Sequence, residues 1–132
     1  MIRLAKSEDI HEIRSLMNTI QGFWQNSWRS DVLESGLRSS DGLAFVYTED
    51  NRIVGFVCAH DLGFRGYLSE LVVAETHRRR GIGRKLVKKV EKELTMRGCE
   101  ILVADVWKDA EAFYVKLGWS PPDVILLRKK LL

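Results

Sequence analysis

Residues 77–86, HRRRGIGRKL, place three consecutive arginines directly before two glycines at the start of a helical pattern. Adjacent like charges repel unless water or an anion takes up their field. The first N–H groups of a helix have no partner within the helix and lie at the positive end of its dipole. Glycine at positions 81 and 83 lets the backbone approach a ligand closely, so the stretch suits a pyrophosphate. A tight turn beside a solvated arginine run explains the same residues equally well.

Two familiar phosphate-binding loops do not fit this stretch. A Walker A loop ends in Gly-Lys followed by Ser or Thr, whereas Gly83 is followed by Arg84 and Lys85. A dinucleotide-binding fingerprint needs a third glycine at the position where this chain has Leu86. The sequence therefore excludes a P-loop and argues against NAD binding.

The composition predicts one globular domain spanning residues 1–132, because 45% of the residues are hydrophobic and 30% are charged. The net charge of +3 is too small to indicate nucleic-acid binding unless the basic residues cluster. Cys58 and Cys99 lack the spacing of a metal site or a disulfide framework, so we expect reduced thiols and a cytoplasmic protein. No signal-peptide pattern opens the sequence and no apolar run is long enough to cross a bilayer, so we expect no membrane partner.

Hydrophobic periodicity predicts helices and strands in alternation. Strands are expected over residues 2–5, 43–49, 53–60, 67–73, 100–106 and 124–131, and helices over residues 7–20, 28–37, 81–97 and 108–118. Asp50, Asn51 and Arg52 separate the second and third strands and predict a hairpin. The order β-α-α-β-β-β-α-β-α-β predicts a mixed α/β (α+β) fold with helices packed on a sheet.

Two motifs in this order resemble the GNAT superfamily of N-acyltransferases. Residues 72–86, VVAETHRRRGIGRKL, match the phosphate motif Q/R-x-x-G-x-G/A through Arg78, Gly81 and Gly83. Residues 110–119, AEAFYVKLGW, match its second motif, a helix carrying FYxxLG. The resemblance extends from about residue 53 to residue 119 in the family's element order. It implies a mostly antiparallel central sheet flanked by about four helices.

The resemblance also implies acetyl-CoA as co-substrate and transfer of its acetyl group to a primary amine. The pantetheine arm would lie between the strand ending at Val73 and the next strand, bonded to backbone like an added strand. The pyrophosphate would lie on the turn over residues 79–84, and Lys88 or Lys89 would approach the 3′-phosphate. The implied cofactor-binding residues are Leu71, Val72, Val73, Arg78, Arg79, Arg80, Gly81, Ile82, Gly83, Arg84 and Tyr114.

Direct attack by an amine requires a base, and Glu70 is the candidate. Relatives more often place their base one position earlier, which is Ser69 here, and a shift of one residue reverses the face of a strand. Glu70 is equally well an ordinary charge on a strand. Tyr114 matches the family tyrosine proposed to protonate the departing thiolate; by spacing alone it reads as a core aromatic. Trp107 stands where many relatives carry an asparagine that contacts the cofactor arm.

The acceptor side of such a site would involve the loop after the first helix. Phe23, Trp24 and Trp28 are the candidate substrate-binding residues, by stacking or cation–π contact, with plain packing as the alternative. The three histidines have no metal-spaced partner, so no metal is expected. Pro121 and Pro122 prevent part of the closing strand pairing, which predicts one of two arrangements. Either the acceptor site of a monomer is more open, or a second subunit of a homodimer completes it.

Two other functions remain open at this stage. One is a catalytically silent acyl-CoA-binding sensor. The other is a nucleic-acid-binding module that uses the run from Arg78 to Arg84, although the absence of interleaved aromatic residues counts against it. The sequence does not name the acceptor amine, because a fold does not determine its substrate.

Overall fold

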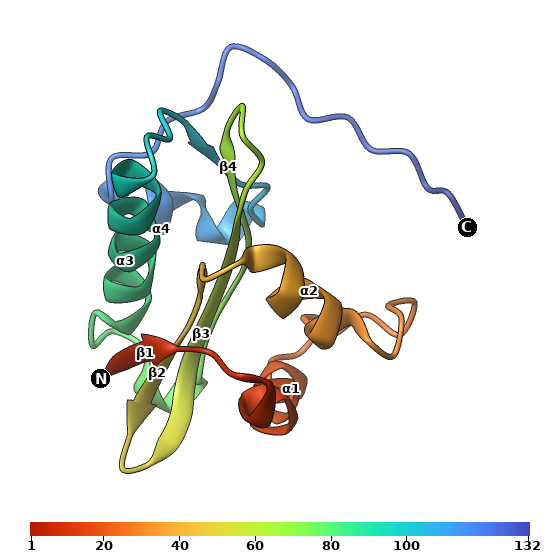
Figure 1. Ribbon diagram of the computed structural model, residues 1–132, viewed down its shortest axis with the longest axis vertical. Helices are drawn as coiled ribbons and strands as arrows, with labels where there is room; N and C mark the ends of the chain where they lie inside the picture. The colour runs from red at the N-terminus through yellow and green to blue at the C-terminus, as the bar shows by residue number, and fades with distance from the viewer.

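The computed structural model describes residues 1–132 as a five-stranded sheet between two layers of helices. The strands are β1 (Ile2–Leu4), β2 (Ala44–Glu49), β3 (Arg52–Asp61), β4 (Gly66–Val73) and β5 (Leu102–Val103). The α-helices are α1 (Ile10–Asn18), α2 (Val32–Ser40), α3 (Ile82–Met96) and α4 (Glu111–Lys116). Short 3₁₀ turns occupy Ser7–Asp9, Glu75–His77 and Lys108–Ala110. Helices α1 and α2 lie on one face of the sheet, and α3 and α4 lie on the other (Figure 1).

The strands follow one another across the sheet in chain order, β1-β2-β3-β4-β5. All neighbours are antiparallel except β4 and β5, which run parallel. The predicted hairpin between β2 and β3 is confirmed: Glu49 pairs with Arg52, and the two residues between them have φ values of 51° and 61°. Positive φ at both positions gives the tight turn whose twist matches that of the flanking strands.

Two hydrophobic cores fill the spaces between the sheet and its helices. Alternate residues of β3 serve different cores, because successive side chains of a strand point to opposite faces. Phe56 packs with Ile13 and Met17 of α1, whereas Val57 packs with Leu86 and other residues of α3. The long helix predicted over residues 81–97 is therefore confirmed, with its apolar stripe buried against the sheet.

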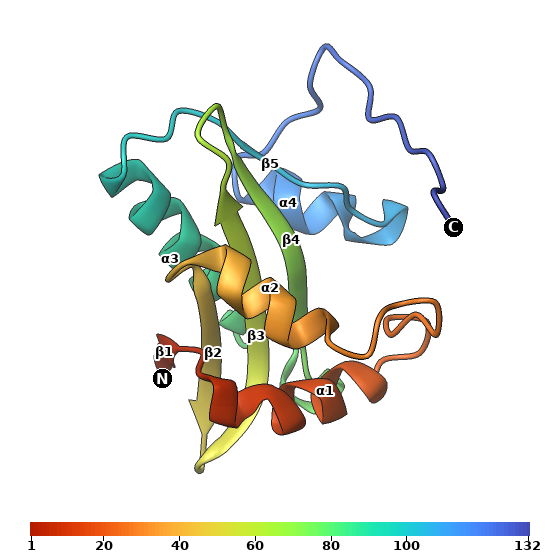
Figure 2. The same ribbon diagram turned by 45° about the vertical axis from the view of Figure 1, so that its right-hand side comes forward.

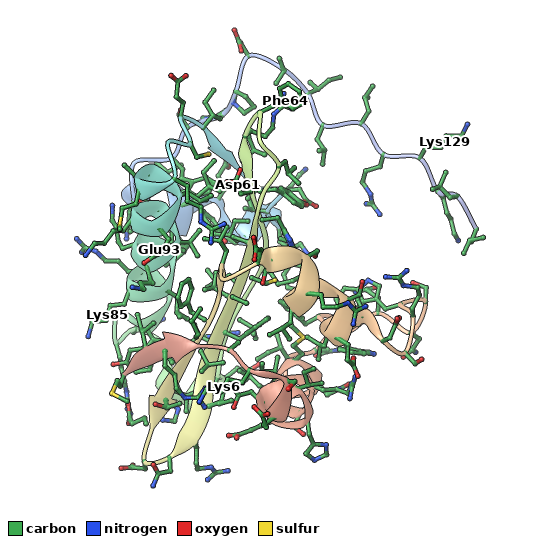
Figure 3. The ribbon with its side chains drawn as sticks, in the orientation of Figure 1. Lys6, Asp61, Phe64, Lys85, Glu93 and Lys129 are labelled. Atoms are coloured by element: carbon green, nitrogen blue, oxygen red, sulfur yellow. The ribbon has the colours of Figure 1, made fainter.

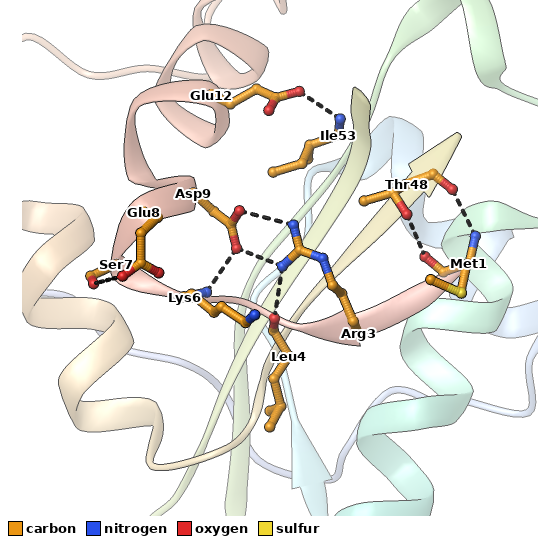
Figure 4. Close-up of polar contacts among 10 residues, drawn as sticks. All are labelled: Met1, Arg3, Leu4, Lys6, Ser7, Glu8, Asp9, Glu12, Thr48 and Ile53. Atoms are coloured by element: carbon orange, nitrogen blue, oxygen red, sulfur yellow. Dashed lines mark hydrogen bonds and ion pairs between the residues drawn. The ribbon is translucent and has the colours of Figure 1, made fainter. Parts of the chain in front are cut away.

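Polar contacts connect the N-terminal strand and the first helix to the rest of the sheet (Figure 4). The guanidinium of Arg3 donates to both carboxylate oxygens of Asp9, at 2.7 and 2.9 Å, and holds the pKa of that carboxyl below its usual range. The carboxylate of Glu12 accepts a hydrogen bond from the Ile53 amide at 2.6 Å. These contacts fix α1 against the start of β3.

The predicted mixed fold is confirmed, but one predicted element is wrong. No strand forms over residues 124–131, and the last regular element is α4. Strand backbone needs a neighbour, and β5 is only two residues long, while Pro121 and Pro122 supply no N–H group. The tail leaves the body of the molecule with Ile125 and Leu127 each 81% exposed. Figure 3 shows Lys129 on this tail, clear of the sheet.

Two predicted elements have shifted boundaries. The strand expected over residues 100–106 is reduced to β5, because the chain turns away from β4 after two paired residues. The helix expected over residues 28–37 is α2, which begins at Val32 after a series of turns. None of the helices combines the length and apolar character needed to cross a membrane.

Candidate active site

A β-bulge in β4 determines which polar side chains share a face of the sheet. Cys58 of β3 pairs with Glu70, but the next residue of β3, Ala59, pairs with Leu68, so Ser69 has no partner. Cys58 belongs to the core under α1 and α2, and its partner Glu70 lies on the same face. Ser69 lies there as well, because its hydroxyl is 3.0 Å from His60 Nε2. Ser69, where relatives more often place their base, and Glu70 therefore both face the side of the sheet that α1 and α2 cover. In a regular strand, two consecutive side chains would point to opposite faces.

The parallel strands β4 and β5 separate after a very short contact. Gly66 pairs with Leu102 and Tyr67 with Val103, and no further pairing follows. The chain after β5 then turns away from β4 towards α4 (Figure 2). A cavity of about 1320 Å³ opens between these arms. Its walls come from residues 20–28, from β4, from residues 75–84 and from residues 104–116.

Backbone groups of β4 face this cavity at alternate positions. The amide of Ala74 donates to Val54 of β3 at 2.8 Å. Because backbone direction alternates along an antiparallel strand, the amide of Val72 also points towards β3. The backbone N–H and C=O groups of Leu71 and Val73 point away from β3, towards the edge of β4 where β5 no longer pairs. Of the three residues predicted to bond a cofactor arm, these two present backbone groups to the cavity, while Val72 contributes to its lining.

The glycine turn before α3 leaves a series of amides without partners. Arg79 and Gly81 have φ values of 65° and 78°, which turn successive N–H groups towards one side. None of the amides of residues 79–84 donates a hydrogen bond within the protein. A Cβ atom on Gly83 would lie 3.2 Å from Phe113 Cζ, so a larger residue would crowd the wall of the cavity. The turn has the free donors and the space that an anion requires.

Three of the four arginines in this segment line the cavity, namely Arg78, Arg79 and Arg84. Arg80 does not: its guanidinium donates to Glu49 of β2 at 3.1 Å. The side chains of Lys88 and Lys89 are paired with Glu91 and Glu93, at 3.3 and 3.1 Å. Positive charge at the turn is therefore concentrated on Arg78, Arg79 and Arg84.

The carboxyl group of Glu70 lines the same cavity in a setting that favours its protonated form. Burial, and secondly the negative charge of Asp105, raise its pKa from 4.5 to about 7. A base whose pKa lies near neutrality is well suited to take a proton from an ammonium group. Sequence reasoning did not single out Asp105, although it lies two residues beyond the carboxyl end of a strand that pairs in parallel, which is where open sheets often place ligand sites.

Tyr114 of α4 lies on the other wall of the cavity and is largely buried. Its ring packs edge-on against Phe113 and Trp119, with centroids 5.0 and 5.1 Å away. Burial, and secondly the charge of Glu70, raise the pKa of Tyr114 to about 12, so its hydroxyl carries a proton at neutral pH. Tyr114 is thus a core aromatic that also lines the cavity and keeps its hydroxyl proton at neutral pH.

Aromatic residues form the end of the cavity near the loop after α1. Phe23 and Trp28 line it, but Trp24 does not. The Trp24 ring packs against Trp28 at 5.2 Å and lies under the Arg14 guanidinium at 5.7 Å. Trp107 lines the cavity from the opposite arm and meets Phe23 edge-on at 5.8 Å. Sequence reasoning placed Trp107 only at the cofactor arm, and this contact depends on tertiary folding.

The buried thiol of Cys58 near the site is unreactive. Burial raises the pKa of the Cys58 thiol to about 12, so Cys58 does not supply a thiolate nucleophile at neutral pH. No group of three or more His, Cys, Asp or Glu side chains is placed to hold a metal ion.

Comparisons with known proteins agree with this geometry. The model of the acetyltransferase (GNAT) family matches residues 8–119. An acetyltransferase of Yersinia pestis (strain Pestoides F) is 34% identical over 136 residues, covering 99% of this chain and 95% of the relative. The aminoglycoside N-acetyltransferase AAC(6')-Iy, solved in complex with CoA, has a TM-score of 0.75 at 20% identity, covering 98% and 99% of the two chains. The ribosomal-protein-S18-alanine N-acetyltransferase of Escherichia coli has a TM-score of 0.76 at 22% identity, covering 89% and 76%.

The chain belongs to the GNAT family of acetyltransferases. It is accordingly an acyltransferase of a family that uses acetyl-CoA, and the mostly antiparallel sheet with its four helices is the fold of this family. The sequences of the two solved structures are less than 25% identical to this chain, so their similarity shows the fold alone.

Proposed function

We propose that this chain transfers an acetyl group from acetyl-CoA to a primary amine by direct attack while both molecules are bound. The observation that carries the proposal is the continuity of one cavity, which joins the free amides of the turn before α3 to Glu70 and Tyr114. The same cavity is therefore lined by free amides that can bind an anion, by a carboxylate with a pKa near neutrality and by a protonated tyrosine.

The residues of the chain fit the parts of acetyl-CoA in turn. The amides of residues 79–84, with Arg78, Arg79 and Arg84, would hold the pyrophosphate by charge-assisted hydrogen bonds. The outward backbone groups of Leu71 and Val73 would bond the pantetheine arm as an added strand does. The bound co-substrate supplies the activated acetyl group as a thioester.

The protein's own groups would then move two protons. Glu70, directly or through one water, accepts a proton from the acceptor ammonium, which frees the nitrogen lone pair for attack. As the new N–C bond forms and the C–S bond breaks, the Tyr114 hydroxyl donates a proton to the departing sulfur. The amine's second proton restores Tyr114 through solvent. Glu70 releases its proton to solvent, so the products are an amide, free CoA thiol and one proton, and the protein returns to its starting protonation state.

The acceptor end of the cavity sets the class of amine. Phe23, Trp28 and Trp107 present ring faces and edges there, which suits an acceptor with an apolar or cationic body. The related proteins of this fold act on an aminoglycoside in one case and on a protein alanine in another. Both kinds of amine therefore belong in the first screen.

The proposal is tested by following thiol release from acetyl-CoA against a panel of small amines, aminoglycosides and peptide N-termini. Thiol release with at least one amine, slowed by about 10²-fold or more in Glu70→Gln and Tyr114→Phe, is the expected result. Calorimetry should show that both variants still bind acetyl-CoA. Binding without release by any amine would instead identify an acyl-CoA sensor. Binding of DNA or RNA that weakens steeply with salt, in the absence of acetyl-CoA binding, would favour the nucleic-acid function.

A further inference from the structure

A hydrogen bond joins the two arms of the cavity at the point where they begin to separate. Tyr67 of β4 pairs with Val103, which is the last paired position between β4 and β5. Two residues further along the second arm, the carboxylate of Asp105 accepts a hydrogen bond from the Tyr67 hydroxyl. No other side-chain hydrogen bond connects β4 to the segment after β5. The contact therefore lies at the apex of the cleft and crosses it.

The bulge at Ser69 brings this contact to the same face as Glu70. Tyr67 pairs with His60, and His60 faces α2, where its Nδ1 is 3.2 Å from the Ser39 hydroxyl. Tyr67 therefore lies on the α1–α2 face, as do Ser69 and Glu70. Without the extra residue, positions 67 and 70 would point to opposite faces. The bulge therefore places Glu70 on the face that carries the contact between Tyr67 and Asp105, and all three residues line the cavity.

Several titratable groups surround Glu70. They are Cys58 on β3, Tyr67 on β4, Asp105 after β5 and Tyr114 on α4, with His60 one contact further away through Ser69. The Cys58 thiol and both tyrosine hydroxyls are protonated at neutral pH, and burial raises the pKa of each group further. Asp105 is the one neighbour whose charge acts on Glu70.

We propose that Asp105 is a positioning residue for Glu70, which it influences by placing a second carboxylate beside it while bonding Tyr67 across the apex of the cleft. This inference rests on the proposed function, in which Glu70 takes the acceptor's proton. The negative charge of Asp105 raises the pKa of Glu70, in addition to the effect of burial. A carboxylate made harder to ionise is a stronger base once it is ionised.

Two substitutions separate the charge of Asp105 from its hydrogen bond. Asp105→Asn keeps an oxygen that accepts from Tyr67 but removes the charge, whereas Tyr67→Phe removes the hydrogen bond and keeps the charge. We expect Asp105→Asn to move the acidic limb of the kcat/KM profile to lower pH by about 0.5 to 1 unit, because a like charge is lost. Tyr67→Phe should lower kcat/KM about 3- to 10-fold with a far smaller shift of that limb. Asp123→Asn, the same charge change on the exposed tail, should leave the profile unchanged.

A titration that needs no acceptor completes the test. The side-chain carboxyl carbon of Glu70 is followed by NMR against pH, in the wild type and in Asp105→Asn, and its signal is assigned by its loss in Glu70→Gln. The midpoint should fall in Asp105→Asn, by the same amount as the kinetic limb. An unchanged midpoint overturns the inference, whether or not any amine is acetylated. A midpoint that falls while the kinetic limb stays in place shows that Glu70 is not the base, which refutes that part of the proposed function and the positioning role with it.

Discussion

Replacing Glu70 by glutamine should make the free protein more stable while slowing acetyl transfer by about 10²-fold or more. The ionised carboxylate is held in a buried place beside Asp105, and the pKa is about 7 against an ordinary value of 4.5. One pKa unit corresponds to about 1.4 kcal/mol, so the shift corresponds to about 3 kcal/mol as an upper figure. Partial contact of the carboxylate with water reduces this figure. We therefore expect the free energy of unfolding of Glu70→Gln to exceed that of the wild type by about 2 to 3 kcal/mol at high pH. Glutamine has the same shape and no charge to bury.

The sign of the pH dependence follows from proton linkage. Because the folded state holds the Glu70 proton more tightly than the unfolded state, the stability due to this group is fully present below pH 4.5. It is lost as the pH rises through about 7. Glu70→Gln does not lose stability in this way as the pH rises. Its free energy of unfolding should therefore exceed that of the wild type by under about 1 kcal/mol at pH 5, and the difference should be near its maximum at pH 8.5.

Thermal unfolding of both proteins without ligand, at pH 5 and pH 8.5, measures this difference. For a domain of this length the expected increase in Tm at pH 8.5 is about 7 to 11 °C. Glu100→Gln, on an exposed residue, is the matched control and should change Tm very little. A Glu70→Gln protein that is no more stable at pH 8.5, or whose advantage is the same at both pH values, would refute the burial argument.

Three further predictions follow from the packing. Gly83→Val should weaken acetyl-CoA binding by more than about 10-fold in calorimetry, because its side chain meets Phe113, while Gly36→Ala, with open space around it, should bind normally. Gly55→Ala should lower the free energy of unfolding by about 1 to 3 kcal/mol in urea, because its Cβ would lie 3.0 Å from atoms of both Ile82 and Leu86; an unchanged midpoint would show that α3 moves aside freely. Amides of residues 124–132, which make no backbone hydrogen bonds, should exchange with solvent at the rate of an unfolded chain while those of β3 are protected, and protection of the tail would mean that it pairs in solution.

Much of the fold was predictable because its signals are local. The apolar stripe of α3 repeats within neighbouring turns of one helix, and the turn at Asp50 and Asn51 is specified by the residues that adopt it. The glycine turn before α3 is equally local, since the free amides and the positive φ of Gly81 belong to one short segment. The final strand was predicted wrongly because a β-rich sequence forms a strand only where a neighbour offers its edge.

The amino-acid sequence alone determined the family, the order of the elements as far as α4 and the position of the glycine turn before α3, because each depends on residues close together in the chain. Only the tertiary structure decided which face Glu70 occupies, since the bulge at Ser69 is a property of the register between β3 and β4. It also decided that Asp105 meets Tyr67, and that Arg80 turns to Glu49 and away from the cavity. Such contacts join segments tens of residues apart, so they exist only once the sheet has formed.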